Sequence, residues 1–264
     1  MLELYVLASG SSGNASVVRD AATGRSVLID CGICKRDFLE RCDALGLDPT
    51  DIEAVLVTHA HGDHTKGLGV VVRGLARLGC RPALFTHPAV RATSEAVRDA
   101  ERNVQACDLA YGEPVGVAGI EVLPFVTSHD VAASMGFRFQ TKDDSLGYMT
   151  DTGVVTPAAH QALAGTRILA IESNHDVVML REGPYPNVLQ QRILSDEGHL
   201  SNAQCCEEVA SLLHPGLQHV VAMHISEHNN TFGLPVRELQ KMLDEHGNPA
   251  TVQAGLPRTP IVVR

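Results

Sequence analysis

The sequence of 264 residues predicts an α/β protein made of one domain. Short β-branched apolar runs, such as 52–57 and 168–172, alternate with longer stretches that have the apolar spacing of helices, such as 234–246. Several apolar runs end in a polar residue, as expected where strand ends gather side chains at one edge of a sheet. No repeat, linker or low-complexity stretch divides the chain, so we expect a single domain over residues 1–264.

The strands and helices follow from the same patterns, taken in chain order. Strands are expected at 4–7, 17–18, 26–30, 52–57, 83–87, 116–126 (two strands or one bent strand), 135–139, 146–150, 168–172, 220–223 and 258–263. Helices are expected at 38–45, 70–78, 88–102, 189–194, 203–213 and 234–246. Gly46 and Gly79 end the first two helices, Pro88 begins the third, and Ser201 or Asn202 caps the helix at 203–213.

Composition indicates a soluble protein of a reducing compartment. Apolar residues make up 44% of the chain and aromatic residues 4%, so the core is expected to consist mainly of aliphatic side chains. We see no signal peptide and no apolar run of the roughly 18 residues that a membrane span needs, and we expect a cytoplasmic protein without membrane contact. The seven cysteines show no disulfide framework, and the Cys31-x-x-Cys34 pair has no second CxxC to complete a zinc site.

The formal charge of −10 counts against broad, non-specific duplex binding, because such proteins carry a basic footprint. It does not exclude a nuclease, since bound divalent ions attract phosphate locally. Two sets of arginines recur at helical spacing and are either a phosphate track or solvated helix faces: Arg73, Arg77 and Arg81, and Arg91, Arg98 and Arg102.

A histidine-rich loop follows the apolar strand at 52–57. His59, His61, Asp63 and His64 lie within six residues. Imidazole suits zinc and other transition metals, and carboxylate can share or bridge ions. One short loop can therefore supply donors to two adjacent ions, whereas a polar loop that is merely rich in histidine is the alternative.

The pattern His59-x-His61-x-Asp63-His64 resembles the signature of the metallo-β-lactamase fold superfamily. Motifs in the order expected for that superfamily extend over nearly the whole chain: Leu28-Ile29-Asp30-Cys31-Gly32, Ser128-His129-Asp130, Met149-Thr150-Asp151-Thr152-Gly153 and Met223-His224-Ile225-Ser226. The segments 9–14, 172–176 and 198–202 are similar to those of the YycJ (WalJ)-like branch, which is akin to ribonuclease Z and phosphodiesterase-type members. This resemblance implies a four-layer αββα sandwich.

The resemblance also implies two metal sites. His59, His61 and His129 match the ligands of a first ion, Asp63, His64 and His224 match those of a second, and Asp151 matches a carboxylate that bridges both. Asp30 is expected to support the metal loop without being a ligand itself. The cofactors would be two divalent ions, Zn²⁺ or Mn²⁺, sharing a hydroxide that attacks a phosphodiester.

Three further roles are expected from the same resemblance. His199 would be a general acid for the leaving group, with Glu172 or His175 orienting it. Asp63 would also orient the nucleophile. The loop at 9–14 is expected either to border the site or to be a plain turn between strands.

The function expected from these motifs is a metal-dependent phosphodiesterase, specifically a 5′-to-3′ exonuclease acting on DNA or RNA ends. The alternative is a phosphodiesterase for small molecules such as cyclic or nucleotide phosphates, which suits the acidic charge. A lactone or thioester hydrolase is the third reading, in which His199 and Glu172 would be idle. The oligomeric state is left open, with a homodimer as one option.

Overall fold

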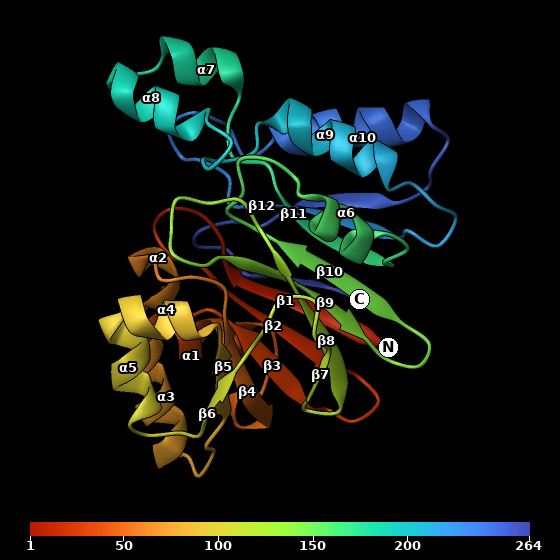
Figure 1. Ribbon diagram of the computed structural model, residues 1–264. Coiled ribbons are helices and arrows are strands. Elements are labelled where there is room, and N and C mark those ends of the chain that lie inside the picture. The colour runs from red at the N-terminus through yellow and green to blue at the C-terminus, as the bar shows by residue number, and fades with distance from the viewer.

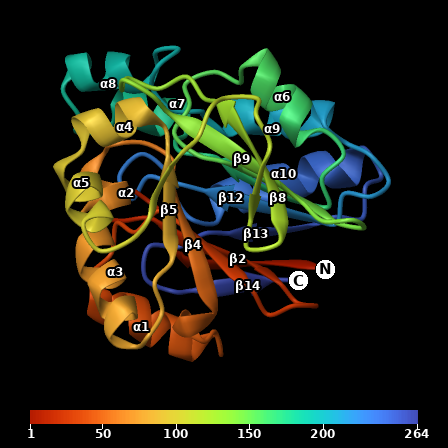
Figure 2. The ribbon, with the colours of Figure 1, turned by 60° about the horizontal axis from the view of Figure 1, so that its bottom comes forward.

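Two seven-stranded sheets face each other, and helices cover both outer faces, as Figures 1 and 2 show. The computed structural model describes residues 1–264. The expected four-layer αββα arrangement is confirmed.

The sheets are mixed, and each is built mainly from one half of the chain. The first has the order β14 (Ile261–Val263), β1 (Leu2–Ala8), β2 (Ala15–Asp20), β3 (Ser26–Ile29), β4 (Ile52–Val57), β5 (Ala83–Thr86), β6 (Ala106–Asp108). The second has the order β13 (Thr251–Ala254), β12 (His219–Met223), β11 (Ile168–Glu172), β10 (Ser145–Met149), β9 (Met135–Gln140), β8 (Ile120–Val126), β7 (Val115–Val117). The last strand, β14, returns to the first sheet and pairs with β1.

The helices form the two outer layers. The first sheet is covered by α1 (Lys35–Ala44), α3 (Leu68–Arg77), α4 (Pro88–Thr93) and α5 (Glu95–Glu101), and the second by α6 (Pro157–Leu163), α9 (Asn202–Ser211) and α10 (Leu234–Glu245). A 3₁₀ turn, Pro49–Asp51, precedes β4, and the short helix α2 (Gly62–Thr65) follows it. The pair α7 (Val177–Glu182) and α8 (Asn187–Ile193) stands out from the body in Figure 1. None of the helices has the length and apolar character needed to cross a bilayer.

Successive side chains along each strand point to opposite faces of the sheet, and the buried ones form three apolar layers. In β1, Leu2, Leu4 and Val6 pack between the two sheets, whereas Tyr5 and Leu7 pack toward the helices of the first sheet. The strand β11 repeats the pattern, because Ile168 and Ala170 face the other sheet and its alternate residues face α6, α9 and α10. A period of two therefore lets each strand bury both of its faces.

Strand direction brings the functional segments to one edge of the sandwich. In the second sheet, β10 to β13 are parallel, and β8 runs the same way because it is antiparallel to β9. In the first sheet, β3 and β4 are parallel, and β1 shares their direction through the antiparallel β2. The carboxyl ends of these strands thus meet at the edge where Ser9, Asp30, His59 and Asp151 follow them.

Most expected elements are present, with two corrections. The expected helix at 88–102 is two helices, because Ser94 leaves helical geometry and caps α5 by accepting a hydrogen bond from the Val97 N–H. The closing strand is shorter than expected and spans only Ile261–Val263. The segment 116–126 is two strands, and Ser201 caps α9 in a capping box with Gln204. The strands β6 and β13 and the helices α2, α6 and α7 were not expected.

An ion pair at the opposite edge ties the two sheets together. Asp144, just before β10, accepts hydrogen bonds from Arg167 Nε and Nη2, both at 2.7 Å, and from the Leu2 N–H of β1 at 2.6 Å. Arg167 also donates to the Leu2 carbonyl at 2.6 Å. Burial alone would raise the pKa of Asp144, but these bonds hold it below its usual value.

We predict that Asp144→Asn destabilises the protein by about 3–5 kcal/mol, because it leaves the Arg167 guanidinium buried without its charge partner. Urea unfolding followed by far-UV circular dichroism measures the effect. The neighbouring Asp143 is exposed, so Asp143→Asn is the matched control and should change stability by less than about 0.5 kcal/mol. Equal effects of the two substitutions would contradict the role given to Asp144.

Candidate active site

The histidine-rich segment lies where β4 ends. It is not a continuous loop, because His61 caps the one-turn helix α2, which carries Asp63 and His64. His59 and His64 are fully buried, whereas the Asp63 side chain is 24% exposed and reaches the surface of the site.

Asp30 holds this segment from the end of β3. Its carboxylate accepts hydrogen bonds from the Thr58 N–H at 2.8 Å, the Thr58 hydroxyl at 2.7 Å and His64 Nδ1 at 2.7 Å. The His64 ring is therefore protonated on Nδ1 and turns Nε2 into the site. The contacts support the expected role of Asp30 as an orienting residue.

The same hydrogen bonds determine the tautomer of His59. The Thr58 hydroxyl donates its proton to Asp30, so its oxygen accepts the bond from His59 Nδ1 at 2.9 Å. The lone pair of His59 then lies on Nε2, which is buried without a hydrogen-bond partner. Burial also holds the pKa of His59 well below its usual value, so the ring is neutral at pH 7.

Two histidines from the second sheet are oriented in the same way. His129, after β8, directs Nδ1 to the Gly198 carbonyl at 3.1 Å. His224, after β12, directs Nδ1 to Glu172 Oε1 at 3.1 Å. Each ring thus presents Nε2 to the site, which is how orienting partners prepare histidines for metal binding.

The donors form two groups with Asp151 between them. His59, His61 and His129 gather on one side, and Asp63, His64 and His224 on the other, with the donor atoms of each group within 4.8 Å of one another. Asp151 Oδ2 lies 3.2 Å from His64 Nε2, and its Oδ1 lies 3.6 Å from His224 Nε2 and 3.8 Å from His129 Nε2. All seven expected ligands are thereby brought together.

The donor set fits divalent metal ions. His61 Nδ1 and His129 Nε2 lie 3.2 Å apart although His129 already donates through Nδ1, and Asp151 Oδ2 is buried without a hydrogen-bond partner. Buried acceptors without hydrogen-bond partners, here His59 Nε2 and Asp151 Oδ2, are suited to a bound cation. Burial would lower the pKa of His64, but the neighbouring Asp151 and Asp30 carboxylates raise it well above the usual value, which reflects excess negative charge.

His199 faces this centre from the other side. Its Nδ1 donates to Glu172 Oε1 at 2.7 Å, and its ring stacks on that of His224 with centroids 5.3 Å apart. Burial alone would raise the pKa of Glu172, but the charges and hydrogen bonds of His199 and His224 lower it to about 2. Glu172, and not His175, orients His199, because neither ring nitrogen of His175 has a hydrogen-bond partner.

Three of the strand-end residues are in the left-handed region of the backbone. Asp30, Asp151 and His224 have φ values of 56°, 53° and 51°. Non-glycine residues rarely adopt this conformation, and such strain concentrates at functional sites.

The site opens into a polar cavity of about 390 Å³. Its walls contain no apolar residue: Ser11, His61, Gly62, Asp63, Asp151, Arg192, His199 and His224. The loop expected to border the site does so, since Ser11 lines the cavity and Ser9 Oγ accepts a hydrogen bond from the His224 N–H at 2.8 Å.

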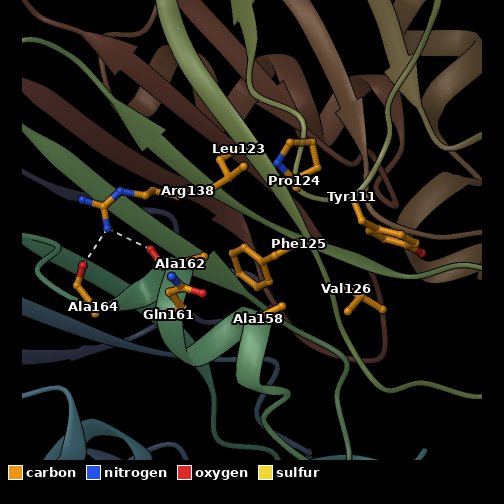
Figure 3. A pocket seen from close by; sticks show the side chains of 11 residues that line it. Tyr111, Leu123, Pro124, Phe125, Val126, Arg138, Ala158, Gln161, Ala162 and Ala164 are labelled. Carbon is orange, nitrogen blue, oxygen red and sulfur yellow. Dashed lines mark hydrogen bonds between the residues drawn. The ribbon is translucent and has the colours of Figure 1, made fainter.

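A larger cavity, about 630 Å³, lies elsewhere, between β8, β9 and α6 (Figure 3). Its walls are mainly apolar, and its one charged residue, Arg138, is occupied by hydrogen bonds to the Ala162 and Ala164 carbonyls. It brings no nucleophile, base or metal donor together.

Two residues that were not individually assigned a role also reach the site. Asn14 Nδ2 lies 2.9 Å from His64 Nε2 and 3.2 Å from Asp63 Oδ2. Arg192 on α8 lines the cavity and donates to Asp130 at 2.5 Å. No local sequence motif marks Arg192 as a site residue. Its position depends on the close approach of the end of α8 to Gly198, where a Cβ would lie 2.4 Å from the Arg192 carbonyl oxygen.

The arginines considered as a phosphate track lie on the helical layer of the first sheet, and several are engaged there. Arg73 pairs with Asp99 at 2.6 Å, and Arg91 pairs with Glu101 and Asp108. Arg98 donates to the carbonyls of residues 91 and 92. These contacts favour the interpretation that the arginines belong to solvated helix faces and not to a phosphate track.

Comparison with known proteins agrees with this site. Residues 25–225 match the family model of the β-lactamase superfamily domain. The chain is 33% identical over 246 residues to an exodeoxyribonuclease YycJ of Bacillus anthracis, covering 93% of this chain and 90% of the relative. It is 31% identical over 242 residues to an exodeoxyribonuclease WalJ of Streptococcus pneumoniae, covering 90% and 84%. The fold matches YhfI from Bacillus subtilis, a metallo-β-lactamase fold protein, with a TM-score of 0.73 at 13% identity over 100% of both chains.

The fold, the donor clusters and the relatives agree, and they identify an enzyme that hydrolyses its substrate with the help of metal. The chain is a metal-dependent hydrolase and belongs to the β-lactamase superfamily, together with the YycJ and WalJ proteins.

Proposed function

We propose that residues 1–264 form one hydrolase domain, a dinuclear metal-dependent phosphodiesterase that removes nucleotides from the 5′ ends of nucleic acid. The observation that carries this proposal is the position of Asp151 between two three-donor groups, with His199, held by Glu172, lining the same cavity. The relatives, which are named exodeoxyribonucleases, favour DNA as the substrate.

The metal ligands would be those expected from the sequence. His59, His61 and His129 would hold one ion and Asp63, His64 and His224 the other, with Asp151 shared. Zinc suits the imidazoles, and manganese suits a site with two carboxylates. The ions would supply Lewis acidity toward the phosphate and a water of lowered pKa.

The remaining chemistry belongs to side chains of this protein. Asp63 is exposed to the cavity and would orient the attacking water. Glu172 keeps the Nδ1 proton of His199 in place, so a second proton would sit on Nε2 and pass to the leaving oxygen. Burial would lower the pKa of His199, but the Glu172 carboxylate raises it above its usual value, which favours that protonated form.

A phosphodiesterase for small molecules is the second candidate. The net charge of −10 and the ion pairs of Arg73 and Arg91 favour it, because no long basic surface is left for a duplex. A lactone or thioester hydrolase would leave the hydrogen bond between His199 and Glu172 without a catalytic purpose.

We predict that the protein, reconstituted with zinc or manganese, releases mononucleotides from the 5′ end of single-stranded oligonucleotides. The substrates are DNA and RNA with a 5′-phosphate or a 5′-hydroxyl, and Asp63→Ala is the inactive control. If only bis(p-nitrophenyl) phosphate is hydrolysed, the small-molecule function replaces the exonuclease. Inactivity toward both would direct the search to thioesters and lactones.

We predict that His199→Ala keeps its metal and loses about 10²–10⁴-fold in kcat, because His199 contributes a proton and no metal bond. Steady-state kinetics and metal analysis of the purified variant provide the two readouts. Loss of metal together with activity would make His199 a ligand and contradict the assignment.

Glu172→Gln is the contrasting variant. Glu172 accepts through both oxygens, since Oε2 receives the Thr152 N–H at 2.9 Å and the Leu200 N–H at 3.3 Å while Oε1 receives both histidines. A glutamine amide would place its NH₂ group, itself a donor, against either the two histidine Nδ1–H groups or the two backbone N–H groups, and that pair would lose its acceptor. We expect about 10–100-fold weaker metal binding in addition to lost turnover, because His224 loses its orienting partner.

A further inference from the structure

A second polar cavity, of about 260 Å³, adjoins the active site. Adjacent residues of the same loop line the two cavities, since Ser11 lines the active site and Ser12 the second cavity. Likewise, Asp63 near the start of α2 lines the active site, and Lys66 at the end of α2 lines the second cavity. We call the second cavity the Lys66–Arg258 pocket; its polar walls include Ser12, Cys34, Asp37, Arg41, Lys66 and Arg258.

The Lys66–Arg258 pocket has an excess of positive charge. Lys66 is exposed, and its Nζ donates to the Ser12 carbonyl at 2.8 Å and to no carboxylate. Arg258 is exposed and also has no ion-pair partner. The one carboxylate of the walls, Asp37, already lies 3.3 Å from Arg36 and 3.7 Å from Arg41. Two cations are therefore available to a ligand in a chain whose net charge is −10.

The pocket is held by the same segments that support the metal donors. Arg41 is mostly buried and donates to the Leu7 carbonyl at 3.0 Å and the Pro257 carbonyl at 2.8 Å. These bonds pin the loop that carries Arg258 to the end of β1. Gly255 lets that loop pack on Ser9, because a Cβ at residue 255 would lie 2.9 Å from the Ser9 Cβ.

Resting on the proposed nuclease function, we propose that the Lys66–Arg258 pocket binds a backbone phosphate of the nucleic-acid strand, next to the phosphodiester being cleaved. Lysine and arginine are the usual partners of nucleic-acid phosphates, which position the strand without reading its sequence. A substrate with a single phosphate fills only the metal site, so the pocket acts only on substrates that carry a second phosphate. Local charge at this pocket lets an acidic protein hold a strand without a long basic surface.

The test is the double variant Lys66→Glu/Arg258→Glu in the metal-loaded, full-length protein. With a 5′-phosphorylated single-stranded oligonucleotide we expect about a 10–100-fold lower kcat/KM, mainly through KM. The slope of log(kcat/KM) against log[salt] should also become shallower by about 0.7 for each lost phosphate contact. With bis(p-nitrophenyl) phosphate, kcat/KM should stay within about twofold, because that ester carries one phosphate.

Arg77→Glu/Arg81→Glu is the matched control. Both arginines are exposed, have no ion-pair partner and lie at or beyond the end of α3, about 15 Å along the helix from its start beside the site. The control changes the net charge by the same amount and should leave kcat/KM for both substrates unchanged.

Three outcomes overturn the proposal in distinguishable ways. An unchanged KM for the oligonucleotide in the Lys66/Arg258 variant overturns the pocket alone. Equal losses of kcat/KM for the oligonucleotide and for the small ester would show damage to the metal site and would also overturn the pocket. Absence of oligonucleotide cleavage by the unaltered protein overturns the proposed function, and the pocket with it.

Discussion

Two buried carboxylates, Asp30 and Glu172, determine which nitrogen four of the site histidines present. Asp30 accepts from His64 directly and sets His59 through the Thr58 hydroxyl, while Glu172 accepts from His199 and His224. Each of these rings then turns Nε2 toward the cavity. A buried carboxylate is costly without partners, and here its partners are the donors that the site requires. The rest of the molecule serves to bring these strand ends to one edge.

The electrostatics of the site favour bound cations. Asp63 and Asp151 face His64 and His224 at 3.2–3.6 Å. Burial alone would lower the pKa of both rings, but Asp151 and Asp30 raise that of His64, and Asp151, Asp63 and Glu172 raise that of His224. Divalent ions would relieve the negative excess and satisfy the buried lone pairs of His59 and Asp151. Substrate phosphates would then meet local positive charge, supplied by the ions, by Arg192 and by the Lys66–Arg258 pocket, in an otherwise acidic molecule.

Much of this architecture was predictable from the sequence because it rests on local patterns. Apolar runs ending in polar residues predicted the strands, whereas the seven donors and the sandwich were implied by the resemblance of the motifs to the metallo-β-lactamase fold superfamily. The misses have physical causes. Ser94 breaks the helix expected at 88–102 through a side-chain cap, and β6 and β13 are short strands whose residues are at most partly buried, so they lack a clear apolar pattern. The positions of Arg192 and Arg258 depend on long-range packing at Gly198 and Gly255, and that of Lys66 on a hydrogen bond to the Ser12 carbonyl, none of which a local motif encodes.

We propose that Asp151 joins two metal sites. Anomalous difference maps from crystals of the protein grown with zinc and with manganese test it most directly. We expect two ions in each chain, one held by His59, His61 and His129, the other by Asp63, His64 and His224, and both in contact with Asp151. A single ion, or two ions of which only one touches Asp151, would contradict it.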